Sequence, residues 1–133
     1  MRFNVLAAIL ASTAPVLAFK INFAEAGYSL ELYSSIEAGG KGDTYNKKIP
    51  WYDIHDGKYC TKCVNLGGNT AGKVHSLNFA SHNTHGGIAE LRFYKKADCK
   101  DEMSPVLQGS AFKLSSMPPE LSIAQSHVYC VRF

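Results

Sequence analysis

The chain has 133 residues, of which 46% are hydrophobic and 19% are charged, and its formal net charge is +3 at pH 7. This length and balance fit one ordinary globular domain and exclude a disordered tail, a collagen-like fibre and a multidomain enzyme. No basic stripe typical of nucleic-acid binding stands out, so we expect no nucleic-acid partner. We interpret the pairs Lys47-Lys48 and Lys95-Lys96 as solvated surface.

The first eighteen residues are typical of a signal peptide. Arg2 is followed by an apolar run over residues 5–11, and Val16 and Ala18 occupy the two positions that a signal peptidase reads. We therefore expect cleavage after Ala18 and a secreted, extracellular domain over residues 19–133. The apolar run is shorter than the roughly 20 residues of a membrane-spanning helix, and no later stretch is apolar enough, so we expect no transmembrane segment.

Alternation of apolar and polar residues with a period of two recurs along the rest of the chain. It is clearest over residues 28–32 and 89–94, and in the second stretch Glu90 and Arg92 share the face that we expect in solvent. Weaker strand candidates span 45–49, 58–66, 73–79, 110–114 and 127–133. Turn-forming clusters lie at 39–43, 67–69, 81–87 and 115–119. Short strands separated by such turns predict an all-β sandwich or barrel.

All four cysteines, Cys60, Cys63, Cys99 and Cys130, lie in the expected mature domain. An oxidising exterior lets them pair, so we expect two structural disulfides, with all three connectivities open. If Cys60 and Cys63 lie on one extended strand, their odd spacing directs them to opposite faces, and each reaches a distant partner more easily than the other. A bridge such as Cys63 to Cys99 would restrict the unfolded chain by roughly 4 kcal/mol.

A weak internal repeat relates the two halves of the chain. A tyrosine opens the repeat in each half, and the positions compared lie five and seven residues after it. A serine in an expected strand follows later in each half. The matched positions are Tyr33, Ala38, Gly40 and Ser76 in the first half and Tyr94, Cys99, Asp101 and Ser126 in the second.

With these positions the chain resembles the βγ-crystallin-like family, and residues 30–33, 63–66 and 93–99 look like its small secreted members in filamentous fungi. The resemblance covers about residues 28–133. It implies a single-domain Greek-key β-sandwich in which a serine packs over each hairpin, and an effector or antimicrobial-type protein that acts on a host or competitor. It does not imply calcium, because neither Ser76 nor Ser126 follows the paired acidic or amide residues of the family's calcium site.

Two close pairs, Cys60-x-x-Cys63 and His82-x-x-His85, have the ligand types of a tetrahedral zinc site. We expect no metal, because a secreted thiol pair is more often oxidised and the two histidines lie in an expected exposed loop. A redox role for the cysteine pair is disfavoured as well, since no βαβ pattern places it at the start of a helix.

Trp51 and Tyr52 belong to the densest aromatic cluster of the chain. Core packing is the more frequent fate of such residues, but an exposed pair would stack on a sugar ring or anchor a protein partner. Together with His82 and His85 they form our candidate binding surface.

A secreted ribonuclease is the enzyme hypothesis, because metal-free RNA cleavage needs a base, an acid and a cation near the phosphate. Glu90 and Arg92, with His75 or His127 on neighbouring strands, have these residue types. We favour an exposed ion pair for Glu90 and Arg92 and assign no catalytic residue, as the chain also lacks the Walker, His-Glu-x-x-His and Gly-x-Ser-x-Gly motifs.

We therefore expect a monomeric binding protein that is not an enzyme, needs no cofactor and recognises an extracellular protein or glycan. The loops at 39–43, 51–56 and 81–87 would present its contacts. The alternatives are a small secreted hydrolase, with ribonuclease first, and a cell-wall glycan-binding module centred on Trp51 and Tyr52.

Overall fold

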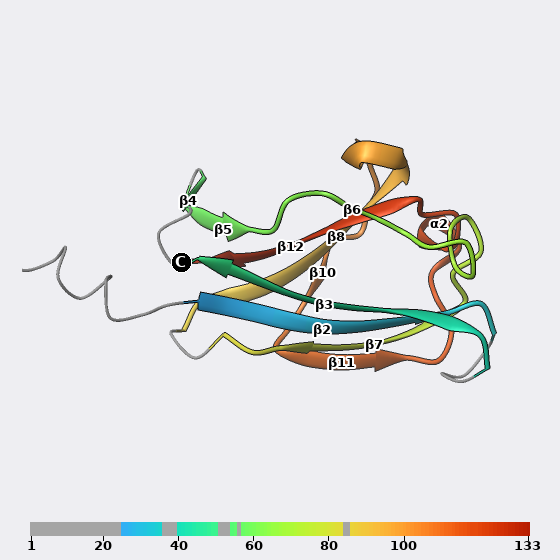
Figure 1. Ribbon diagram of the computed structural model, residues 1–133, viewed down its shortest axis with the longest axis horizontal. Coiled ribbons are helices and arrows are strands. Elements are labelled where there is room, and N and C mark those ends of the chain that lie inside the picture. Colours follow the sequence, from blue (N-terminus) through green and yellow to red (C-terminus); the bar gives the residue numbers. More distant parts are fainter. Residues whose placement is uncertain (1–24, 36–39, 51–53, 56, 84–85) are drawn as a thin grey trace, which may run out of the picture.

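Two antiparallel sheets stack face to face in the computed structural model, which describes residues 25–35, 40–50, 54–55, 57–83 and 86–133 (Figure 1). The all-β sandwich predicted from the sequence is confirmed at this level. The signal peptide expected over residues 1–18 lies outside the described residues. Within the described ranges, no helix has the length and apolar character needed to cross a membrane.

The first sheet has four strands in the order β11-β7-β2-β3. Their bounds are β2 Glu25–Tyr33, β3 Gly42–Pro50, β7 Ser76–Ser81 and β11 Ala111–Leu114. Period-two alternation places Tyr28, Leu30 and Leu32 of β2 on the face that packs in the core, as the sequence predicted. β3 is the last strand of this sheet and pairs with β2 over its whole length.

The second sheet has seven strands, in the order β10-β8-β12-β5-β4, with β6 also paired to β12 and β9 to β8. Their bounds are β4 Ile54–His55, β5 Lys58–Cys60, β6 Val64–Asn65, β8 Ile88–Lys96, β9 Lys100–Glu102, β10 Leu107–Gln108 and β12 Ser126–Arg132. A short 3₁₀ helix, η1 Ala97–Cys99, follows β8, and the one-turn helix α2 Pro119–Ser122 precedes β12.

The stretch predicted as one strand over 58–66 is divided into β5 and β6 by residues 61–63. Both pieces run along the same edge of β12, because β8 occupies the other edge. At the break, the N–H of Thr61 donates to the carbonyl of Tyr129 at 2.8 Å. The N–H of Tyr129 donates to Oγ1 of Thr61 at 3.1 Å, so a side chain replaces the backbone acceptor that the interrupted strand no longer offers.

Each half of the chain contributes strands to the sheet of the other half. β2, β3 and β7 share the first sheet, whereas β5 and β6 from the same half pair with β12 in the second. Conversely, β8, β10 and β12 share the second sheet, whereas β11 pairs with β7 in the first. Because of this exchange both halves pack into one core, in which Tyr28 and Phe79 from one sheet contact Tyr129 from the other.

The internal repeat of the sequence has a matching hydrogen-bond pattern. In both halves a buried serine lies across the ladder from the tyrosine of the repeat, and its hydroxyl donates to the carbonyl two residues after that tyrosine. The hydrogen bonds are Ser76 Oγ to Ser35 O at 2.8 Å and Ser126 Oγ to Lys96 O at 2.6 Å.

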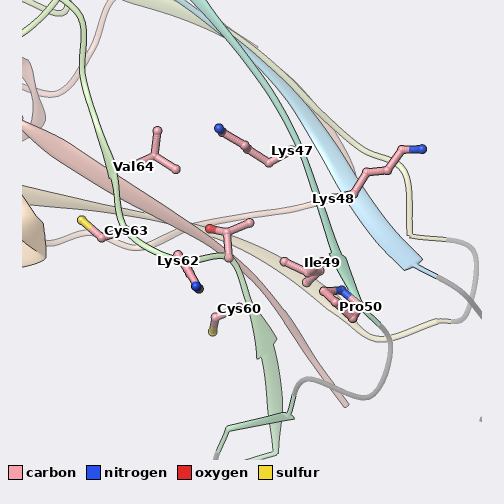
Figure 2. Close-up of a pocket in the computed structure, with 9 residues that line it drawn as sticks. Lys47, Lys48, Ile49, Pro50, Cys60, Lys62, Cys63 and Val64 are labelled. Carbon is pink, nitrogen blue, oxygen red and sulfur yellow. The ribbon is translucent and has the colours of Figure 1, made fainter.

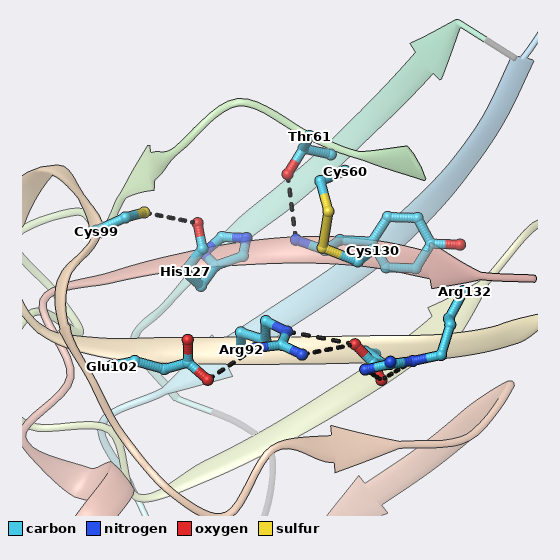
Figure 3. Close-up of a disulfide and its surroundings, with 10 residues drawn as sticks. Cys60, Thr61, Arg92, Cys99, Glu102, His127, Cys130 and Arg132 are labelled. Atoms are coloured by element: carbon cyan, nitrogen blue, oxygen red, sulfur yellow. Dashed lines mark hydrogen bonds and ion pairs between the residues drawn. A yellow bond between two sulfur atoms is a disulfide. The ribbon is translucent and has the colours of Figure 1, made fainter. Parts of the chain in front are cut away.

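Two disulfides are present, as expected, and they are Cys60–Cys130 and Cys63–Cys99. Cys60 and Cys130 lie directly opposite each other on β5 and β12 (Figure 3). The second bridge joins the break after β5 to η1. The structure thereby selects one of the three connectivities. Each cysteine of the close pair has a distant partner, but the two do not share one extended strand, because Cys60 ends β5 and Cys63 lies in the break that follows it.

Candidate functional site

A groove of about 360 Å³ lies between β3 and the segment that joins β5 to β6 (Figure 2). Residues 47–50 of β3 form one wall, and residues 60–64 form the other. β3 brings its unpaired edge to this side of the sandwich, since it is the last strand of its sheet. We call this feature the lysine groove, because Lys47, Lys48 and Lys62 are its charged residues.

The charge of the lysine groove is positive on both walls. Lys47 extends from β3 toward Val64 on the facing wall, Lys48 extends away from the groove, and Lys62 belongs to the facing wall (Figure 2). None of the ion pairs between described residues involves Lys47 or Lys62, and both side chains are exposed. The nine lining residues include no carboxylate, so the walls do not neutralise their own field.

The wall that carries Lys62 is covalently anchored on either side of this residue. Cys60 binds β12 through Cys130, and Cys63 binds η1 through Cys99. Buried Ile49 and half-buried Val64 supply apolar surface on the two walls. The groove therefore combines an anchored backbone with two lysine side chains that have no ion-pair partner among the described residues.

A fully buried histidine, His127 of β12, lies between the sheets, close enough to Lys47 to feel its charge. Its Nε2 is 2.7 Å from Oη of Tyr28, and its ring lies edge-on to that of Tyr45. Its Nδ1 has no hydrogen-bond partner among the described residues. Burial, and then the charge of Lys47, lower the pKa of His127 from 6.5 to about 3, so the imidazole is neutral at pH 7.

We expect His127 to make the protein sensitive to acid. The pKa of His127 is about 3 in the folded state, and the reference value of 6.5 applies to the unfolded chain. Between pH 3 and pH 6.5 the unfolded chain therefore binds more protons than the folded protein. The free energy of unfolding should therefore fall from about pH 6.5 toward pH 3, by up to roughly 1.4 kcal/mol per pH unit. Urea unfolding at pH 7, 6, 5 and 4 measures this slope, and His127→Phe should flatten it. Equal slopes for both proteins would contradict the assignment.

The structure separates Glu90 from His127, two residues of the ribonuclease hypothesis. Glu90 of β8 lies opposite Cys130 of β12, and adjacent strands present paired residues on the same face. His127 is three positions from Cys130, so it faces the opposite side of the sheet. His75 bonds the carbonyl of Ser34 through Nδ1 at 2.8 Å. An arrangement of Glu90 with His127 at one phosphate is therefore excluded.

The prediction that Glu90 is exposed is wrong, because its side chain is completely buried on the outer face of the second sheet. Its carboxylate accepts hydrogen bonds from Arg132 at 2.7 Å and Arg92 at 3.1 Å (Figure 3). It accepts a third from Gln108 at 3.0 Å. Burial alone would raise the pKa of Glu90, and these three donors outweigh it, so the pKa is lowered. The donors also exclude water from the carboxylate.

Most of the binding surface predicted from the sequence lies outside the described residues. Trp51, Tyr52 and His85 are in this group, whereas His82 is exposed and its Nε2 lies 2.9 Å from Oγ of Ser29. The lysine groove was not predicted. Lys47 and Lys48 are exposed, as expected, but only the fold brings Lys47 and Lys62 to the same groove.

The zinc hypothesis is excluded, because Cys60 and Cys63 both belong to disulfides and neither is a thiolate ligand. In the described part of the chain, no group of three or more His, Cys, Asp or Glu residues is placed to hold a metal ion. Comparisons with protein-family models, with curated proteins and with solved structures gave no match.

Proposed function

We propose that this chain is a small secreted binding protein of the effector or antimicrobial type, with a βγ-crystallin-like double Greek key. It acts on a host or competitor by binding a target in the lysine groove, not by catalysis. The observation that carries the proposal is the pair Lys47 and Lys62, which belong to the two walls of the groove and have no ion-pair partner among the described residues.

The strand order supports the Greek-key part of the proposal. In a Greek key the fourth strand returns by a long connection to lie beside the first. β7 lies beside β2, and β12 lies beside β8, and these are the last and first major strands of the two halves. The repeated serine hydrogen bonds of Ser76 and Ser126 add a second, independent likeness between the halves.

The lining of the groove supports binding in preference to catalysis. It contains cations, a hydroxyl and apolar side chains, whereas general acid–base chemistry relies mostly on a histidine or carboxylate near neutral pKa, which the nine lining residues do not offer. The two disulfides anchor one wall before any ligand arrives. A site ordered in advance loses less conformational entropy on binding, which favours affinity. The disulfides also fit an oxidising, extracellular setting.

The test is exposure of plant tissue and of competing fungi and bacteria to the purified, disulfide-bonded protein. Lys47→Glu/Lys62→Glu reverses the charge of the groove, and we expect it to raise the effective dose at least tenfold. Lys73→Glu/Lys113→Glu is the matched control, since both lysines are exposed and neither lines the groove. Equal potency of the three proteins would refute the groove as the site of action, and inactivity of the wild type in every assay would refute the function.

A further inference from the structure

The lysine groove has features that define the chemistry of its ligand, and we propose that it binds a uronate unit of an acidic extracellular polysaccharide. This inference rests on the proposed binding function and names the ligand of the same site. It draws on the size of the groove, the positions of its charges, the unpaired edge of β3 and the location of the exposed apolar residues elsewhere.

The size of the groove excludes very small and very large ligands. A volume of about 360 Å³ is in the lower range of sites that hold small molecules, typically about 300–1,000 Å³. A single inorganic anion would leave most of it empty. A stable protein partner would need an interface of roughly 1,200 Å² or more, far beyond what nine lining residues provide. One or a few units of a sugar chain match this space.

The charges of the groove require an anion of low charge density. Lys47 extends from β3 toward the facing wall, and a lysine ammonium acts as a compact point charge, not as a bidentate fork. One such charge on this wall, with Lys62 adding positive potential from the other, suits the one carboxylate that a uronate unit carries. A densely sulfated chain or a nucleic acid would call for a longer basic stripe than these walls present.

The remaining surface of the groove suits a sugar ring. Half-buried Pro50 and Val64, on the two walls, offer apolar contact to the C–H faces of a ring. The edge of β3 that the sheet leaves unpaired carries backbone N–H and C=O groups, which are the donors and acceptors that sugar hydroxyls need. A mostly apolar pocket with a few polar groups that fix orientation is the usual design of a small-ligand site.

A membrane surface fits the groove less well. Peripheral binding to anionic lipid draws on clusters of about four to eight basic residues or on exposed apolar side chains that enter the interface. The exposed large hydrophobic residues of the described chain are Ile88, Ile123 and Phe133, and none of them lines the groove. Binding to lipid is therefore kept as an outcome that the test detects.

Isothermal titration calorimetry at low and at physiological salt tests the inference with tetragalacturonate as the probe. Cellotetraose is the neutral match, a heparin-type tetrasaccharide is the sulfated match, and phosphatidylserine vesicles represent a membrane. We expect heat only with tetragalacturonate, and binding that weakens at least tenfold in Lys47→Glu/Lys62→Glu. The control Lys73→Glu/Lys113→Glu should bind like the wild type. Amide NMR shifts should be confined to residues 47–50 and 60–64.

Several results would overturn the inference. These are no binding of tetragalacturonate, equal binding of cellotetraose, tighter binding of the sulfated sugar or the vesicles, or shifts that lie away from the groove. The failure of the inference is distinguishable from that of the proposed function. If the charge-reversed variant loses biological potency while the wild type ignores uronate, only the ligand is wrong. If the wild type binds uronate through the groove but has no effect on cells, only the effector or antimicrobial function is wrong.

Discussion

Replacement of Glu90 by alanine is expected to lower the free energy of unfolding by about 3–5 kcal/mol. The carboxylate is wholly buried and accepts hydrogen bonds from Arg92, Arg132 and Gln108. Its removal leaves two guanidinium groups beside one another on the same face without the anion between them. Urea denaturation at pH 7 measures the loss, and the lowered pKa of Glu90 means that the same loss should develop in the wild type at acidic pH, where the carboxylate is protonated.

Glu102→Ala is the matched control for Glu90→Ala. Glu102 also pairs with Arg92, at 2.7 Å, but its side chain is 45% exposed. An ion pair in contact with water contributes about 0–1 kcal/mol, so this variant should unfold nearly like the wild type. A similar loss of unfolding free energy in both variants would show that burial does not determine how much Glu90 contributes to stability.

Removal of the Cys60–Cys130 disulfide is expected to lower the free energy of unfolding by about 4 kcal/mol in Cys60→Ala/Cys130→Ala. The bridge links residues 70 positions apart, so it removes a large loop-closure entropy from the unfolded chain. Replacement of both cysteines avoids a free thiol that would form wrong bridges. Chemical denaturation measures the change, and a loss below about 1 kcal/mol would contradict the chain-entropy account for this bridge.

The Cys63–Cys99 bridge provides the comparison. Its loop of 36 positions predicts a slightly smaller loss for Cys63→Ala/Cys99→Ala, since the entropy depends only on the logarithm of loop length. Both variants also release the wall that carries Lys62 at one side. We therefore expect each variant to bind tetragalacturonate more weakly than the wild type, even at temperatures where the variant remains folded. Such a result would show that the loss of binding comes from the released wall of the groove and not from unfolding.

Much of three long strands was predictable because their pattern is local, whereas β3 was predicted only over residues 45–49 and its first two residues were wrongly assigned to a turn. Alternation identified the strands that became β2, β8 and most of β12, since one face of each packs in the core. β4, β9 and β10 were missed, because two or three residues are too few to show a period. The interruption between β5 and β6 was also missed, since it depends on Thr61 bonding to a strand almost seventy residues away.

The candidate site was less predictable than the fold. Alternation placed Glu90 on the outer face of its strand, which is correct, but solvent exposure did not follow. Its burial depends on Arg132 and Gln108, which come from other strands. In the same way, the sequence showed Lys47 only as one of two adjacent lysines. The groove forms because the sandwich brings β3 opposite the segment that carries Lys62.

The sequence by itself determined that the chain forms short strands with one apolar face, because alternation involves only neighbouring residues. It also led to the expectation of two disulfides, because four cysteines in an oxidising compartment pair. Only the tertiary structure decided which cysteines pair, which outer-face charge is buried and where a cationic groove opens. These features depend on strand register and on sheet stacking, which join residues far apart in the chain, and no local pattern encodes those distances.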